Sequence, residues 1–520
     1  MLAFPGRAAY YLSVLIISSE GGIPAVVMVR RSISTGILGA GLSGVLMGIR
    51  LKQAGLENFT IYEKADDVGG TWKHNTYPGL HCDVPSHLYS YSFEPNPDWS
   101  LPFAGQQEIQ AYLRRCAEKY GLLKHLRFGA SVETARYQEG GGAWELTLDG
   151  GEIRTHDILV SATGGLTAPS FPRIDGLDLF RGPLWHSAAW RHGFDFTGKR
   201  VAVIGSAASA VQVIPHVAET AAALHVFQRD PNWVLPRNNI PYTDEMKAAF
   251  RDPETGALTR HRRQLYRNTL RWYRAFQRDP ESIATLRHVA LKNMKSAITD
   301  PALTARLTPA YDPGCKRLLV SDDYYPALAL PTTQVIPHGV AKLTETGVTA
   351  TDGTSVQADV VIFCTGYKLG GREDGRPAVE VLGRDGAPLS LALRNRPEAY
   401  RGVAVPGFPN YFTIVGLNGS VAYSSLFYSA ELHTDYILKW IEEIGRENLL
   451  STEVRPEPTR RYNETIQSEL QKMSWSAGCK NFYLDRTGRN VSFYPGTLGR
   501  MRRELRDLKH DDFIIRRAAP

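Results

Sequence analysis

Residues 32–44 read SISTGILGAGLSG and join an apolar strand to three glycines, Gly39, Gly41 and Gly44. The following residues have helical spacing, and a second apolar strand, NFTIYE, ends at Glu63. The order of strand, G-x-G-x-x-G turn, helix, strand and acid is typical of a dinucleotide-binding unit. The glycines allow a tight turn, a close backbone approach to a pyrophosphate and close packing of helix on strand. Glu63, 24 residues after Gly39, is suited to accept hydrogen bonds from an adenosine ribose.

The same unit recurs in residues 199–230, KRVAVIGSAASAVQVIPHVAETAAALHVFQRD. Gly205 begins the second turn, and Arg229 follows it by 24 residues, the offset of Glu63 from Gly39. A guanidinium at this position suits a 2′-phosphate, so the second site is predicted to prefer NADPH to NADH. Alanines stand where glycines are usual at 207 and 210, and the methyl of Ala207 crowds the pyrophosphate. The predicted contacts of this turn are Gly205, Ser206, Ala207 and Ser209.

A second pair of similar segments supports two nucleotide units. DILVSATGG (157–165) and DVVIFCTGY (359–367) are both buried-type strands that end in Thr-Gly, and each is predicted to return to its own sheet. We therefore predict an α/β fold with two Rossmann-like domains, the second inserted in the first, and a helical insertion. The predicted segments are an N-terminal extension (1–29), the first domain (30–175 and 371–520), the second domain with its linker (176–239 and 313–370) and the insertion (240–312).

Composition limits the other functional classes. The 520 residues carry a modest net charge of +7, with no recognised module for nucleic acid, so no nucleic-acid partner is expected. Five scattered cysteines contain no C-x-x-C pair, so neither a metal site nor a redox disulfide is predicted. An apolar stretch near the N-terminus is too short to span a bilayer. A cytoplasmic setting is predicted, and monomer and homodimer both stay open.

Two longer motifs narrow the chemistry. GGTWKHNTYPGLHCDVPSHLYSYSF (69–93) follows the first glycine turn, and FRGPLWHSAAW (180–190) precedes the second. They resemble the signatures of Baeyer–Villiger monooxygenases, the second through Phe180, Gly182, His186 and Trp190. This second motif lies between the two domains and is predicted to be a linker, in which Gly182 would allow an unusual backbone angle. The resemblance implies that His186 and Trp190 couple cofactor binding to rotation of the domains.

The resemblance implies FAD in the first site and NADPH in the second. It also implies that one atom of O₂ is inserted beside a ketone carbonyl, through a C4a-peroxyflavin, to give an ester or lactone. In GCKRLLVSDDYYPAL (314–328), Arg317 would stabilise the negatively charged oxygen species and Asp83 would hold Arg317 in place. Lys316 would join Arg229 near the 2′-phosphate. The remaining implied cofactor contacts are Thr71, Trp72 and Tyr89 at the flavin, His81 and Asp83 at the nicotinamide nucleotide, and Asn418 at the flavin's pyrimidine side.

Two alternatives stay open at this point. One is a flavin monooxygenase that oxidises nitrogen or sulfur, which requires a protonated oxygen donor and is disfavoured by Trp190 and Arg317. The other is a nucleotide-binding sensor without turnover. Aromatic residues of the helical insertion are predicted to belong to the core rather than to a substrate pocket. The identity of the ketone is not readable from the sequence.

Overall fold

The computed structural model describes residues 32–166, 168–368 and 377–518. The predicted N-terminal extension lies outside these residues, as does the predicted boundary between residues 370 and 371.

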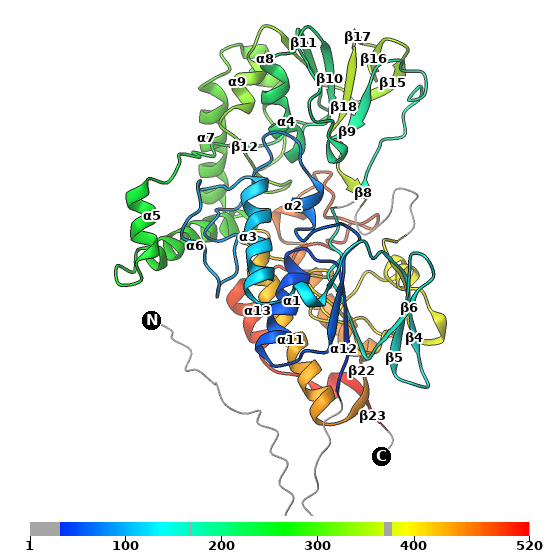
Figure 1. The fold of residues 1–520 in the computed structure, drawn as a ribbon. Coiled ribbons are helices and arrows are strands. Elements are labelled where there is room, and N and C mark those ends of the chain that lie inside the picture. Colours follow the sequence, from blue (N-terminus) through cyan, green and yellow to red (C-terminus); the bar gives the residue numbers. More distant parts are fainter. Residues whose placement is uncertain (1–31, 167, 369–376, 519–520) are drawn as a thin grey trace, which may run out of the picture.

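Two parallel five-stranded sheets form the centres of the two units (Figure 1). The apolar runs predicted as strands are buried on both faces, as parallel strands require. In strand order, the first sheet consists of β21 (Tyr411–Thr413), β7 (Ile158–Ser161), β1 (Thr35–Leu38), β2 (Phe59–Tyr62) and β3 (Leu126–Arg127). The second consists of β14 (Thr333–Ile336), β11 (Ala223–Phe227), β10 (Arg200–Ile204), β18 (Val360–Phe363) and β9 (Leu184–His186).

The predicted return strands pair with the strands that precede the glycine turns. Thr35 of β1 is in register with Ile158 of β7, and Val201 of β10 with Val360 of β18. The predicted α/β class with two such units is confirmed. The chain crosses between the units twice at one place, where β8 (Ala168–Pro169) and β19 (Tyr367–Lys368) pair antiparallel.

Helices cover both sheets. Helix α1 (Leu42–Gln53) follows the first turn and packs against α11 (Leu426–Arg446), and α4 (Ala208–Ala218) follows the second turn and packs against α9 (Tyr324–Leu328). Outside residues 240–312, the other described helices of four or more residues are α2 (Thr71–His74), α3 (Gln106–Lys119), α10 (Leu389–Asn395), α12 (Pro456–Leu470) and α13 (Leu498–Glu504).

Smaller sheets complete the two units. Strands β20 (Glu380–Leu382), β4 (Val132–Gln138), β5 (Ala143–Leu148) and β6 (Ile153–His156) form one sheet, and β15 (Val340–Thr344), β16 (Gly347–Ala350) and β17 (Ser355–Gln357) form another. Two further pairs are β12 (Val234–Leu235) with β13 (Leu319–Val320), and β22 (Leu449–Val454) with β23 (Phe513–Arg517).

The predicted helical insertion is present and contacts both units. It contains α5 (Asp244–Arg251), α6 (Ala257–Phe276) and α7 (Pro280–Lys295), on the left of Figure 1, and α8 (Pro301–Leu307), at its top. Capping side chains and N-terminal prolines set the starts of α7 and α8. Phe250 and Phe276 join the core of the first unit, whereas Met294 and Leu307 join that of the second. The insertion therefore bridges the units, and the domain limits given above stay predictions.

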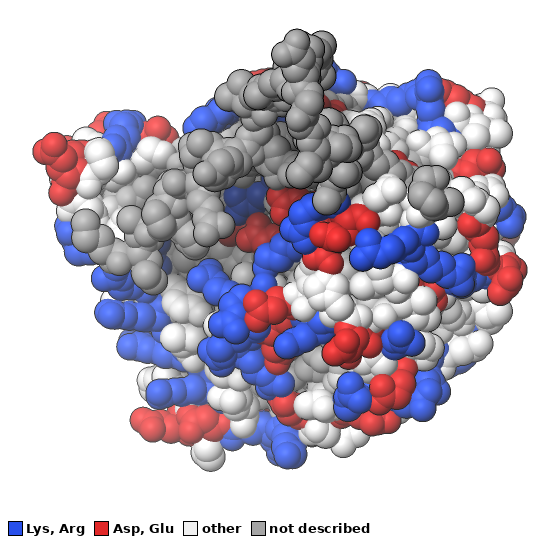
Figure 2. All heavy atoms as spheres, turned by 90° about the horizontal axis from the view of Figure 1, so that it is seen from below, with Lys and Arg blue, Asp and Glu red and all other residues white. Residues whose placement is uncertain are grey.

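The face of the molecule seen from below in Figure 2 carries charges of both signs. In the view from below, Lys and Arg side chains are interspersed with Asp and Glu on the coloured part of the face (Figure 2). No helix within the described residues has the length and apolar character needed to cross a membrane.

Candidate active site between the two nucleotide units

One large cavity of about 1720 Å³ extends from the first glycine turn to the second. Typical sites for one small ligand measure roughly 300–1,000 Å³, so this cavity has room for more than one ligand. Both crossing segments border it, through Thr163, Gly164, Thr365 and Gly366.

The first turn shows why glycines are needed there. Gly39 has φ +97°, a value that side-chain-bearing residues rarely adopt. A Cβ on Gly44 would lie 1.8 Å from the carbonyl oxygen of Gly39, so the helix can pack this closely only without a side chain. Gly41 lines the cavity at the start of α1, where no side chain caps the helix. The first backbone N–H groups of α1 are therefore available to an anionic ligand.

Glu63 is buried at the end of β2 and borders the cavity. Its two carboxylate oxygens accept hydrogen bonds from the backbone N–H groups of Ala40 (2.8 Å) and Ala65 (2.9 Å). The acid therefore fixes the turn as well as facing the predicted ribose position. Thr71, Trp72 and Tyr89 also line the cavity, and the Trp72 indole N–H donates to the Tyr89 hydroxyl at 3.0 Å.

The second turn has the same backbone course. Gly205 has φ +125°, and a Cβ there would lie 2.3 Å from the carbonyl oxygen of Cys364. Ala207 caps α4 without a side-chain hydrogen bond, which again leaves the first N–H groups of the helix available. The cavity is bordered by Gly205, Ser206, Ala207, Ser209 and Arg229. Arg229 is exposed at the end of β11.

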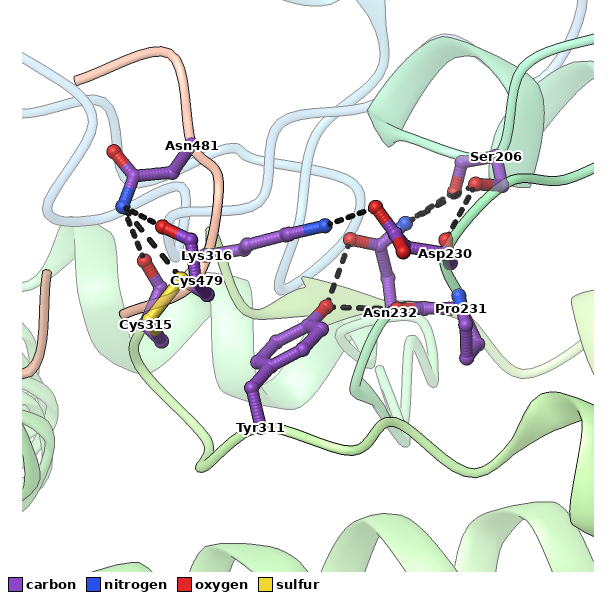
Figure 3. Close-up of polar contacts among 9 residues, drawn as sticks. All are labelled: Ser206, Asp230, Pro231, Asn232, Tyr311, Cys315, Lys316, Cys479 and Asn481. Atoms are coloured by element: carbon purple, nitrogen blue, oxygen red, sulfur yellow. Dashed lines mark hydrogen bonds and ion pairs between the residues drawn. A yellow bond between two sulfur atoms is a disulfide. The ribbon is translucent and has the colours of Figure 1, made fainter. Parts of the chain in front are cut away.

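The Lys316 ammonium lies 3.1 Å from a carboxylate oxygen of Asp230 and 4.9 Å from the centre of the Tyr311 ring (Figure 3). Asp230 is also joined to the second turn, because its backbone carbonyl accepts from Ser206 Oγ at 3.2 Å. Lys316 thus neutralises the acid beside Arg229, and both cations border the cavity.

Asp83 and Arg317 meet in the cavity between the two turns. The guanidinium donates two parallel hydrogen bonds, Nη2 to Oδ1 at 2.6 Å and Nε to Oδ2 at 2.5 Å. The carboxylate of Asp83 raises the pKa of Arg317 well above its usual range, although burial opposes this. Burial disfavours the ionised form of Asp83, but the charge and hydrogen bonds of Arg317 outweigh it, and the pKa of Asp83 is lowered. The pair therefore places a permanent cation at the cavity wall.

The segment that carries Asp83 also contacts the second unit. Gln212 of α4 donates to the backbone carbonyl of His81 at 2.9 Å, and Ser209 donates to the Tyr77 hydroxyl at 3.3 Å. Burial lowers the pKa of His81, which lines the cavity. The 77–83 segment therefore couples the second turn to the Asp83–Arg317 pair.

The segment predicted as a linker is built into the second unit. Leu184–His186 forms β9, the edge strand beside β18. Gly182 does not have a positive φ, so the predicted unusual backbone angle is wrong; a Cβ there would instead lie 2.4 Å from the Asp359 carbonyl oxygen. Burial lowers the pKa of His186 to about 4, so this histidine is neutral near pH 7. Phe180 is buried and Trp190 packs edge-on against Trp185; none of the four motif residues borders the cavity.

Three further findings differ from the sequence-based expectations or add to them. Asn418 is buried away from the cavity, and its amide donates to the carbonyls of Asn490 and Phe493, both at 2.8 Å. Trp272 and Phe276 of α6 pack in the core of the first unit, as predicted, but they also line the cavity. Cys315 and Cys479 form a disulfide that was not predicted from the sequence, because spacing cannot reveal a pair 164 residues apart. Within the described residues, no cluster of His, Cys, Asp and Glu could hold a metal ion.

Sequence reasoning also missed the aromatic wall of the cavity. Besides the two aromatics of α6, it includes Tyr423, Trp475, Phe482, Tyr483 and Phe493 from the C-terminal part. These residues come from segments without a periodic pattern, so only the fold brings them together.

Comparison with known proteins agrees with this arrangement. Residues 33–252 match the flavin-binding monooxygenase-like family. A Baeyer–Villiger monooxygenase of Streptomyces coelicolor is 38% identical over 498 residues, which are 95% of this chain and 94% of the relative. The chain belongs to the Baeyer–Villiger monooxygenase family. Structures in this family share its fold throughout: cyclohexanone monooxygenase from Rhodococcus sp. Phi1 bound to NADP⁺ has a TM-score of 0.82 at 27% identity, covering 94% of this chain and 99% of that one. The complex of OTEMO with FAD and NADP also has a TM-score of 0.82, at 26% identity and with 93% and 99% coverage.

Proposed function

We propose that this Baeyer–Villiger monooxygenase uses FAD and NADPH to insert one oxygen atom of O₂ beside a ketone carbonyl, giving an ester or lactone. The observation that carries the proposal is the Asp83-bound Arg317 in the wall of a cavity that both glycine turns border. Relatives support both cofactors, since the OTEMO structure contains FAD and NADP. Cytoplasmic location, where NADPH is supplied, is part of the same proposal.

The residues present fit the two cofactors. Gly41 has no side chain and lines the cavity at the uncapped start of α1, so this place suits the FAD pyrophosphate. Glu63 suits the ribose of FAD. The uncapped start of α4 suits the NADPH pyrophosphate, and Arg229 with Lys316 suits its 2′-phosphate. When bound, FAD would provide the chemistry of accepting a hydride from NADPH and activating O₂.

Arg317 would supply a fixed positive charge where negative charge develops on oxygen during attack on the ketone carbonyl. An arginine suits this role because its proton is not lost at working pH, and Asp83 holds its guanidinium in one orientation. A preorganised charge in a site shielded from water stabilises such a transition state more than water does. Asp83 is thus proposed as a positioning residue for Arg317.

We infer that the substrate is an apolar ketone. The aromatic wall described above faces the same cavity as Arg317, and apolar lining with a few polar groups is the pattern of small-molecule sites. The keto oxygen would be oriented by the polar groups near Arg317, while the remainder of the molecule contacts the aromatic rings.

Incubation with NADPH, ¹⁸O₂ and a panel of cyclic, linear and aryl ketones, followed by mass spectrometry, tests this function. One ¹⁸O atom in the ester, with one NADPH consumed for each ester, is the expected result. Incorporation into an added sulfide or amine, with none into any ketone, would identify the alternative monooxygenase chemistry. Bound FAD without NADPH oxidation in air would identify a sensor and contradict the proposal.

A further inference from the structure

A disulfide joins the two segments that lie on either side of Arg317. Cys315 and Cys479 have Cα atoms 6.2 Å apart and are separated by 164 residues. Cys315 directly precedes Lys316 and Arg317, whereas Cys479 directly precedes residues 480–483, all of which line the cavity. The disulfide therefore links one wall of the cavity to another. The described cysteines outside it, Cys82, Cys116 and Cys364, are buried free thiols.

Hydrogen bonds reinforce this link. The Asn481 amide donates to the backbone carbonyls of Cys315 (3.2 Å) and Trp475 (2.9 Å), and Figure 3 shows it beside the disulfide. Ser474 Oγ donates to the carbonyl of Gly314 at 3.0 Å. The bonds from Asn481 to Cys315 and from Ser474 to Gly314 end on the two residues immediately before Lys316 and Arg317.

Tyr483 lies four residues after Cys479 and borders the cavity. This residue is buried beside Arg317; burial raises the pKa of Tyr483 to about 12, and the positive charge of Arg317 acts in the opposite direction. The segment that carries Tyr483 has no regular structure of its own, because residues 477–497 contain no helix or strand. Residues 483–494 are held by backbone hydrogen bonds, such as Val491 N–H to the Tyr483 carbonyl and Tyr494 N–H to the Ser420 carbonyl. In this described segment, residues 478–482 make no backbone–backbone hydrogen bond, so a cross-link at Cys479 restricts this part strongly.

We propose that the Cys315–Cys479 disulfide is a positioning element that holds residues 479–483 against the Arg317 segment, and that its reduction uncouples NADPH oxidation from oxygen insertion. The inference rests on the proposed function. Without the link, residues 479–483 would move from the cavity wall and admit more water near Arg317, whose side chain already faces the open cavity. O₂ would then be reduced to hydrogen peroxide, with one NADPH and one proton consumed for each peroxide, and no ester would form from that turnover.

The reduction step needs a dithiol. A thiolate of the dithiol attacks Cys479 Sγ, the partly exposed sulfur-bearing residue, and Cys315 leaves as a thiolate that takes up a proton. The second thiol of the reagent then releases Cys479 and closes the oxidised ring. Two electrons and two protons are transferred, giving two protein thiols. Disulfides in a reducing compartment are usually catalytic or redox-sensing, which fits a link whose state alters the fate of NADPH.

The test uses the FAD-loaded full chain, before and after treatment with dithiothreitol. Titration of the denatured protein should give three thiols before reduction and five after it, from the five cysteines of the chain. Reduction should raise hydrogen peroxide formed per NADPH by about three- to tenfold and lower ester per NADPH correspondingly, with little change in flavin content. Removal of the reagent and reoxidation should restore coupling.

Variants separate positioning from folding. Cys315→Ser/Cys479→Ser should behave like the reduced enzyme and ignore dithiothreitol, whereas Cys116→Ser, a buried free thiol in α3 outside the cavity, should behave like the wild type. For each variant, KM for the ketone, kcat and the melting temperature are all measured, so that a change in activity can be told apart from a loss of folding stability. Should the double variant fail to fold, reversible reduction of the wild type still decides the question.

Five thiols in the untreated protein, or unchanged coupling after complete reduction, would overturn the proposal. Limited proteolysis with mass spectrometry provides a readout that does not depend on the reaction, because reduction should increase cleavage within residues 477–497. If no ketone is oxygenated but this cleavage increases, the proposed function fails while the link stands. If ketones are oxygenated equally well in both states, the link fails while the function stands.

Discussion

The glycine turn after β1 and the glycine turn after β10 follow the same backbone course but differ in the side chains around them. In both, a glycine with positive φ begins the turn and an uncapped helix follows. In the first, the acid Glu63 is buried and hydrogen-bonded to the turn itself. In the second, Arg229 is exposed to the cavity. We infer that the first turn is completed for a cofactor that stays bound, and the second is left open for one that is exchanged.

The largest difference is expected at the third glycine position. Gly44→Ala would place a methyl 1.8 Å from the Gly39 carbonyl oxygen, so the protein should lose FAD and about 3 kcal/mol or more of folding stability. Ala210→Gly at the matching position should cost only about 1 kcal/mol, since the second helix already accommodates a methyl. Flavin absorbance and chemical denaturation measure both variants. Equal losses in the two would contradict the comparison.

The next effect concerns Arg317, which lies between the turns. Arg317→Ala should reduce ester formation about 10²- to 10³-fold, because the fixed charge is lost. Reduction of the flavin by NADPH, followed in a stopped-flow instrument without oxygen, should change far less. Arg317→Lys keeps a charge but not the two parallel hydrogen bonds to Asp83. Its rate of ester formation should therefore lie between the rates of the wild type and of Arg317→Ala. An Arg317→Ala enzyme with native ester formation would refute the assignment.

A smaller effect is expected at Arg229. Arg229→Ala should raise KM for NADPH by about 10- to 100-fold, because charge-assisted hydrogen bonds to the 2′-phosphate are worth roughly 1.5–3 kcal/mol. KM for NADH should stay unchanged, since NADH has no such phosphate. Arg263→Ala, an exposed arginine of α6 outside the cavity, is the control. Equal preference for the two nucleotides in the wild type would disprove recognition by Arg229.

The smallest effects belong to the second glycine position. Gly41→Ala should leave the fold intact, because a Cβ there comes no closer than 3.5 Å to its nearest neighbour, but should weaken FAD binding by crowding the pyrophosphate. Ala207→Gly should relieve the crowding in the second turn and strengthen NADPH binding by less than about 1 kcal/mol, which would appear as a lower KM for NADPH. Titration calorimetry and steady-state kinetics compare the pair. Tighter FAD binding by Gly41→Ala would contradict the assigned role of this position.

Local patterns in the sequence were sufficient for the two sheets. Each turn, its helix and its return strand could be predicted because their glycine spacing and apolar runs are contained in short segments. The contact between Asp83 and Arg317 was implied only by the resemblance to the family, since 234 residues separate them. Position 182 requires glycine because a side chain would collide with the Asp359 backbone, not because of an unusual backbone angle. The sequence could not show this, since Asp359 is far along the chain.

The disulfide and the aromatic wall could not be predicted, because both depend on how irregular segments pass one another. The cysteines at 315 and 479 follow no motif spacing, and Tyr483 and Phe493 lie in a stretch without periodicity. Asn418 shows the converse: its motif pointed to the flavin, but its amide is used by two backbone carbonyls of the C-terminal loop. Side-chain direction is the information that the sequence pattern lacks.

The paired crossing of β8 and β19 has a consequence for engineering. The chain leaves the first unit through β8 and returns through β19, and these two strands are paired. The segment between them, residues 170–366, is therefore inserted into the first unit at one place. Chimeras that swap this segment between relatives need only two junctions, both at that ribbon. Such chimeras should fold only if Phe250 and Phe276 of the transferred segment fit the core of the recipient's first unit, where they pack in this protein.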